Sequence, residues 1–83
     1  MNELRQVYKW EDRQWSIIDF VNLKNNDIFI MKESDNEIVK GENGHNVFLA
    51  ISNPFVNKDG IYTILIHDFP TLILAMEYLQ GDR

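Results

Sequence analysis

The stretch Asp27-Ile28-Phe29-Ile30-Met31-Lys32 decides the fold of this 83-residue chain. Its apolar side chains alternate in a strand, so that Ile28 and Ile30 lie on one face and Phe29 and Met31 on the other. A strand that is apolar on both faces is typical of the centre of a covered sheet. We therefore predict a central strand, whose second face meets either the C-terminal helix or a sheet that curls back on itself.

Two short aromatic or β-branched runs precede this strand and predict a first hairpin. The runs are residues 6–10 and 15–18, and a polar segment separates them. After the hairpin, Phe20 and Leu23 are spaced as on one helical turn, and residues 25–27 tolerate turn backbone. The sequence thus predicts a hairpin, then a turn, then the central strand.

The segment after the central strand predicts an antiparallel meander. The polar and glycine-containing segments favour turns, and Asp59-Gly60 is a strong signal for a tight turn. The expected order is a turn at 33–36, a short strand at 37–40, a turn at 41–44, a strand at 45–52, a loop at 53–60 and a strand at 61–66.

The last segment predicts a helix over residues 69–80. Asp68 can cap its start, Pro70 fits its first turn, and Gly81 can end it. Its apolar stripe is wider than one core contact needs; the residues involved are Leu72, Ile73, Leu74, Ala75, Met76, Tyr78 and Leu79. A sixth strand over 72–76 stays open as an alternative, because short apolar runs fit either structure. The expected fold is α+β in one domain, residues 1–83.

Composition and charge narrow the classes of function. The formal net charge is −5, which argues against nucleic-acid binding, because phosphate contacts need a basic face. The chain has no cysteine, no secretory signal and no apolar window long enough to span a membrane. We expect a cytoplasmic protein that binds neither nucleic acid nor membranes.

No catalytic or metal-binding signature is present in the sequence. His45 and His67 stand beside turns without a nucleophile pattern, which favours histidines that face solvent or cap an element. The carboxylates of residues 33–37 lack the calcium-loop pattern. We expect no enzyme activity, no cofactor and no metal.

Aromatic side chains are the best candidates for binding a partner. They belong either to the core and a cross-strand pair, or to a surface that anchors a partner or stacks on a base-like ligand. Together with two positions on the expected helix, the candidates are Tyr8, Trp10, Trp15, Phe55, Tyr62, Ile73 and Tyr78.

Residues 20–33, followed by residues 50–55 and 60–64, resemble small SH3-like β-barrel proteins that bacteriophages often encode. Those proteins commonly carry a Leu-Lys-x-Gly-Asp-x-Phe turn into their first long strand; here Leu23, Lys24, Asp27 and Phe29 match it, and Asn26 stands where the glycine is usual. The resemblance implies a curled antiparallel sheet or SH3-like barrel of about five strands. It also implies a phage or prophage origin and an accessory role.

The first functional hypothesis is therefore a phage-type accessory protein that binds and inhibits a host or defence protein in the host cytoplasm. The surplus apolar face of the helix also fits a homodimer. An alternative is a module that sequesters a nucleotide-like ligand, for which cations must converge near the aromatic residues; the candidates are Arg5, Lys9, Arg13 and Lys24. A third hypothesis is a structural component of an assembly.

Overall fold

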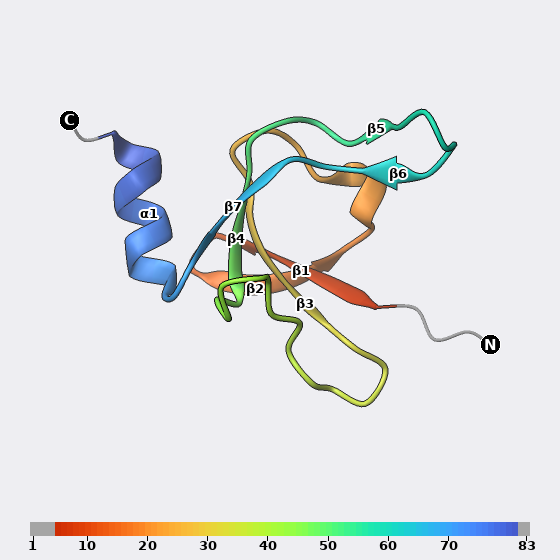
Figure 1. Ribbon diagram of the computed structural model, residues 1–83. Coiled ribbons are helices and arrows are strands. Elements are labelled where there is room, and N and C mark those ends of the chain that lie inside the picture. The colour runs from red at the N-terminus through yellow and green to blue at the C-terminus, as the bar shows by residue number, and fades with distance from the viewer. Residues whose placement is uncertain (1–4, 82–83) are drawn as a thin grey trace.

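A computed structural model describes residues 5–81, and its main element is a five-stranded antiparallel sheet with the strand order β2-β1-β3-β4-β7 (Figure 1). The strands are Gln6–Glu11 (β1), Gln14–Ile18 (β2), Ile28–Lys32 (β3), Val47–Ala50 (β4) and Ile66–Phe69 (β7). The remaining elements are a 3-10 turn at Phe20–Asn22 (η1), a two-stranded ribbon of Phe55–Val56 (β5) and Tyr62–Thr63 (β6), and the helix Leu72–Gln80 (α1).

The predicted α+β class, with an antiparallel sheet and a C-terminal helix, is confirmed. β2 and β7 are the two outer strands, so the sheet is open rather than closed into a barrel. In the part of the chain that the structure describes, the single helix is too short to cross a membrane.

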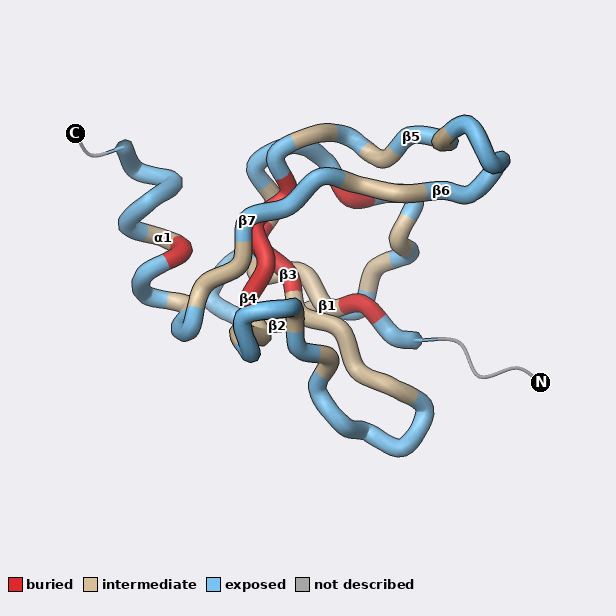
Figure 2. The backbone as a smooth tube through the Cα atoms, viewed as in Figure 1, coloured by how far each residue is buried: buried red, intermediate tan, exposed pale blue. Residues whose placement is uncertain are grey.

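The central strand β3 separates two apolar layers, as its alternating sequence predicts. On one face, Phe29 belongs to a buried cluster with Phe48 of β4. On the other, Ile28 packs with Leu49 and with Ala75 of α1. The buried positions of β3 and β4 therefore lie at the middle of the molecule, with α1 over one face of the sheet (Figure 2).

A tight turn at Asp12 and Arg13 joins β1 and β2. Both residues have positive φ values, 55° and 65°, which suit the type I′ turn of two-residue hairpins. The turn sets the register, with Glu11 opposite Gln14 and Trp10 opposite Trp15. The predicted first hairpin is confirmed.

The turn into β3 is built around Asn26, which has a φ of 80°. Asparagine tolerates this left-handed region better than most residues, so it can stand where the resemblance has a glycine. The Asn26 amide donates to the Ala50 carbonyl at 2.7 Å, and the Lys24 amide donates to the Asp27 carboxylate at 2.8 Å. These bonds tie the turn to the end of β4.

Three predicted strands differ from the structure. Residues 37–40 form no strand, and only a single bridge joins Ile38 to Lys32. Residues 61–66 do not form one continuous strand, because the chain leaves the ribbon after Thr63 and enters the main sheet at Ile66. The Ile51 amide donates to the Leu65 carbonyl at 2.9 Å where this change of sheet occurs. The strand predicted at 45–52 is shorter, Val47–Ala50.

The helix begins at Leu72 rather than at residue 69, because Phe69 pairs with Val47 as the last residue of β7. Thr71, not Asp68, is the N-cap, and its hydroxyl accepts a hydrogen bond from the Leu74 amide at 3.2 Å. The alternative of a sixth strand over 72–76 is wrong. The predicted end is confirmed, since Gly81 has a φ of 77°.

Candidate protein-binding surfaces

The seven candidate residues lie on three separate parts of the surface rather than at one site. Tyr8, Trp10 and Trp15 belong to the first hairpin. Phe55 and Tyr62 belong to the β5–β6 ribbon, which we call the arm and which comprises residues 55–63. Ile73 and Tyr78 belong to α1.

The two tryptophans of the first hairpin form a cross-strand pair. Their ring centroids are 5.0 Å apart and their planes meet at 63°, an edge-to-face arrangement. Both side chains are half-buried and pack against the cluster that contains Ile28 and Leu49. This geometry supports the interpretation that the tryptophans belong mainly to the core.

Trp10 also lines a pocket of about 260 Å³ beside the end of α1. Ile28, Met76 and Leu79 form its apolar walls, and Asn26, Asp27 and Gln80 complete the lining. No basic side chain of the described residues lines it. The pocket therefore suits a neutral or apolar group better than an anion.

Tyr8 is engaged within its own part of the sheet. Its hydroxyl donates to the Gln6 side chain at 2.9 Å, and the Lys32 ammonium lies 5.2 Å from its ring centroid. The ring thus has a cation–π partner already. Tyr8 is therefore a weaker candidate for a partner contact than its aromatic side chain alone suggested.

The arm exposes apolar side chains along both of its strands. Val56, Ile61 and Tyr62 are each more than half exposed, and Phe55 is 40% exposed. In Figure 1 the arm extends from the end of the sheet that lies away from α1. The sequence did not identify Val56 and Ile61 as candidates, because Val56 lies in the predicted loop 53–60 and Ile61 in the predicted strand 61–66; the apolar residues on both sides of Asp59-Gly60 were the available signal.

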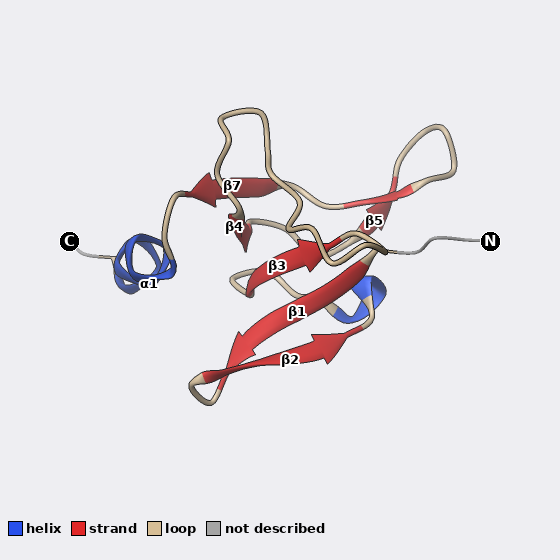
Figure 3. Cartoon of the chain, turned by 90° about the horizontal axis from the view of Figure 1, so that it is seen from below, coloured by secondary structure: helices blue, strands red, loops and turns tan. Residues whose placement is uncertain are grey.

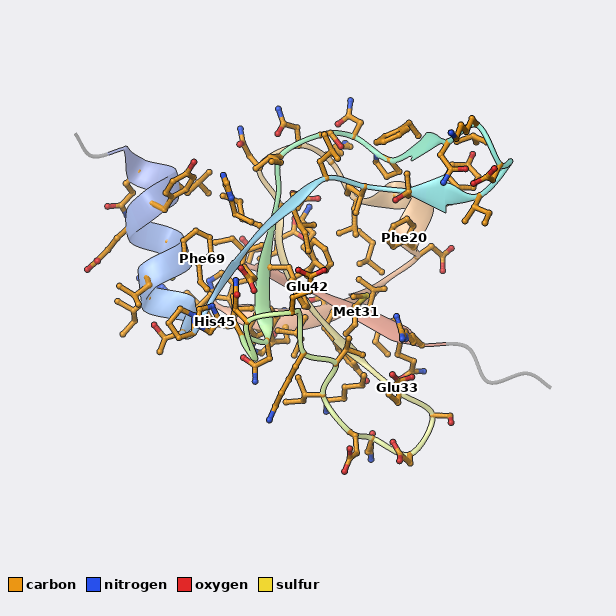
Figure 4. All side chains as sticks on the ribbon, viewed as in Figure 1. Phe20, Met31, Glu33, Glu42, His45 and Phe69 are labelled. Carbon is orange, nitrogen blue, oxygen red and sulfur yellow. The ribbon has the colours of Figure 1, made fainter. Side chains whose placement is uncertain are left out.

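The tip of the arm is fixed by hydrogen bonds of Asn57. Its side-chain oxygen accepts from the Asp59 amide at 2.9 Å and from the Ile61 amide at 3.1 Å. Its backbone amide donates to the Ile61 carbonyl at 2.9 Å, and Gly60 takes a φ of 78°. At the base of the arm, Ile64 and Phe20 pack on the Phe29 cluster (Figure 4). The arm therefore has a defined shape although most of its apolar side-chain surface is exposed.

The outer face of α1 carries the other exposed apolar residues that were predicted. Ile73 is 65% exposed, whereas Tyr78 packs at one side on the rings of His67 and Phe69, at centroid distances of 5.3 and 5.4 Å. Figure 4 places Phe69 beside the helix. Leu74 is exposed as well, so the predicted apolar surplus of this helix is present.

A second pocket, of about 500 Å³, contains lysines but none of the candidate aromatic residues. Lys9 and Lys24 line it, and the Lys9 ammonium lies 3.5 Å from the Asp27 carboxylate and 3.8 Å from that of Glu11. These two carboxylates partly neutralise Lys9.

The other two cations lie elsewhere. Arg5 pairs with Glu33 at 3.2 Å, and Arg13 lies at the turn of the first hairpin. The four cations therefore do not converge on the aromatic residues, as a nucleotide site would require.

The histidines form no arrangement typical of catalysis. His45 Nδ1 lies 3.8 Å from Asp68 Oδ2, and His67 packs against the rings of Tyr78 and Phe69. Within residues 5–81, no group of three or more histidine, cysteine, aspartate or glutamate side chains is placed to hold a metal ion. The exposed apolar surfaces are thus the candidate functional features.

Comparison of the chain with protein-family models, with curated proteins and with solved structures found no match.

Proposed function

We propose that this chain is a non-enzymatic, phage-type accessory protein that binds and inhibits a host or defence protein in the host cytoplasm, with the arm as its main contact. The observation that carries the proposal is the exposure of Phe55, Val56, Ile61 and Tyr62 on one projecting ribbon. Large apolar side chains gathered on an exposed element favour a protein interaction surface.

The register of the arm indicates the shape of the partner site. Phe55 lies opposite Thr63, and Val56 lies opposite Tyr62. Neighbouring residues in a strand point to opposite faces, so Phe55 and Tyr62 project from different faces of the ribbon. A flat partner would cover only one of them, whereas a cleft covers both. We therefore favour a partner with an apolar cleft into which the arm inserts.

Energetics support the arm as the contact. A two-stranded ribbon by itself is only marginally stable in water, and this one keeps most of its apolar surface exposed. Burial of apolar surface stabilises a complex by roughly 25 cal/mol per Å² before the costs of association. Phenylalanine and tyrosine are large enough to supply much of that gain, and inhibition follows where the occupied cleft is the partner's own working site.

The backbone of the turn into β3 supports the assignment to the small SH3-like proteins of phages. Asn26 adopts a φ of 80°, the conformation that the usual glycine of the Leu-Lys-x-Gly-Asp-x-Phe turn can take without strain. The open sheet would then be a divergent form of that barrel.

Affinity capture from a bacterial lysate with matched variants tests the proposal. We expect Phe55→Ser/Tyr62→Ser to lose the captured protein, because both anchors become polar. Ile73→Ser on α1 should keep it, since Ile73 is more exposed than either arm residue but lies on another element. Capture that is equal for all three chains, or none by the wild-type chain in lysates of candidate hosts, would contradict the proposal.

Sequestration of a nucleotide-like ligand is a second candidate, favoured by the pocket beside Trp10. No basic side chain of the described residues lines this pocket, so a neutral nucleoside fits it better than a phosphate does. Titration of tryptophan fluorescence with adenosine and with AMP tests it. We expect a response to adenosine that is stronger than the response to AMP, and no response to either would exclude this candidate.

A further inference from the structure

The free edge of β2 lacks the features with which proteins usually protect an outer strand. Its sequence, Gln14-Trp15-Ser16-Ile17-Ile18, contains no charged residue and no proline. Ile17 is 67% exposed, the highest value among the large exposed apolar side chains of residues 5–81. Figure 3 shows β2 at the rim of the sheet, and among the described strands its one neighbour is β1.

The hairpin turn determines which backbone groups of β2 point outward. In a hairpin with a two-residue turn, the flanking pair Glu11 and Gln14 is hydrogen-bonded, and bonded pairs then alternate along the strands. The amide and carbonyl of Ser16 therefore face β1, whereas those of Trp15 and Ile17 face away from it. No turn, loop or cap hydrogen bond among the described residues uses these outward groups.

We propose that two copies of this chain pair through their β2 edges, antiparallel and centred on Ser16, so that two five-stranded sheets become one. In this register, Trp15 of each copy lies opposite Ile17 of the other. The outward amide of each residue donates to the outward carbonyl of its opposite, and the two-fold axis repeats both bonds. The exposed Ile17 side chain is then covered by an indole.

Charge complementarity selects a second copy as the occupant. The same register brings Arg13, which directly precedes β2, near Asp19 of the other copy, which directly follows β2, at both ends of the seam. Both residues are exposed, and neither belongs to an ion pair among residues 5–81. Opposite charges that meet across paired strands stabilise the pairing.

The neighbouring registers lose this match. Pairing centred on Trp15 places Arg13 opposite Ile17, and pairing centred on Ile17 places Trp15 opposite Asp19. Of these three registers, the one centred on Ser16 combines the apolar pair of Trp15 and Ile17 with the charged pair of Arg13 and Asp19. In that register the β2 edge is complementary to a second copy of itself.

The other outer strand, β7, is not equivalent. It contains His67 and Asp68, and Pro70 follows it directly. Charged residues and proline hinder pairing at a sheet edge, so β7 is protected where β2 is not. The inferred dimer therefore uses β2 rather than the C-terminal helix, and it does not rest on the proposed function of the arm.

Sedimentation velocity over a range of protein concentrations tests the inference. The wild-type chain should change from one chain to two as the concentration rises. Ile17→Lys should stay monomeric where the wild type is dimeric, because a lysine blocks the edge, and Ile73→Lys on α1 should dimerise as the wild type does. Thermal unfolding checks that both variants are folded; each replaces a highly exposed residue.

A charge exchange tests the register itself. Arg13→Glu should weaken the dimer about tenfold, because two attractive pairs become repulsive. Arg13→Glu/Asp19→Arg should restore the wild-type dissociation constant, since the pairs re-form with reversed signs. The proposal is overturned if the wild type stays monomeric or forms particles larger than two chains. It is also overturned if Ile73→Lys, rather than Ile17→Lys, dissociates the dimer, or if the double variant does not restore dimerisation.

Discussion

Phe29 of β3 lies directly opposite Phe48 of β4, with ring centroids 5.6 Å apart. Both rings are almost completely buried and belong to the same cluster. The pair joins the two central strands of the sheet through side chains as well as through backbone hydrogen bonds, so it should contribute strongly to stability.

Phe48→Ala should therefore lower the free energy of unfolding by about 3–5 kcal/mol, because it leaves a cavity in the middle of the core. Urea denaturation followed by tryptophan fluorescence measures the change. Val21→Ala is the control, since Val21 is about half exposed and should cost much less. A loss below about 1 kcal/mol for Phe48→Ala would show that the core rearranges around the missing ring.

Substitutions at Asn26 should follow the backbone conformation. Asn26→Gly should leave stability nearly unchanged, whereas Asn26→Val should cost on the order of 1–2 kcal/mol, because a β-branched residue is strained at a φ of 80°. Asn25→Val controls for the loss of an asparagine in the same turn. Chemical denaturation measures all three, and equal effects of valine at both positions would contradict this explanation.

Removal of the helix cap should affect α1 directly. Thr71→Ala deletes the hydroxyl that accepts from the Leu74 amide and should cost about 1 kcal/mol. Thr71→Ser keeps that acceptor and should remain close to the wild type. Thermal unfolding followed by circular dichroism distinguishes them; similar losses for both variants would mean that the cap contributes little.

A substitution at the tip should loosen the arm without weakening the core. Gly60 has a φ of 78°, and a Cβ there would meet no atom within 4 Å, so Gly60→Ala introduces backbone strain and no clash. We expect a strain of roughly 1 kcal/mol. Hydrogen exchange of the Asn57 and Ile61 amides should become faster, while the amides of β3 keep their protection. Equal acceleration in β3 would mean that the arm and the sheet open together.

The sequence predicted the centre of the fold because alternation in one short run carries that information. Ile28 and Phe29 must face opposite layers, and both layers are present. The strand order is harder to predict from the sequence, because the pairing of β1 with β3 depends on contacts between segments that are distant in the chain. The break between β6 and β7 was missed for a related reason: Ile61 to Ile66 is uniformly β-like, and the change of sheet depends on Ile51 and Ser52, which bond to Leu65.

The candidate surfaces were predicted in part. Aromatic composition identified Phe55 and Tyr62, and the apolar stripe of the expected helix identified Ile73; all three are exposed. Composition alone could not distinguish Phe55 and Tyr62 from Trp10 and Trp15, because it does not show whether an aromatic side chain packs on the core or faces water. Val56 and Ile61 became visible only when the short ribbon of the arm was recognised as a structural element.

The two layers divided by β3 give the molecule two independent sides. Ile64 at the base of the arm packs on the layer that contains Phe29, and Ala75 of α1 packs on the layer that contains Ile28. A protein bound to the arm would therefore leave α1 uncovered. If the arm binds a protein as proposed, one chain would still present the exposed apolar face of α1, and a dimer joined through β2 would present two arms.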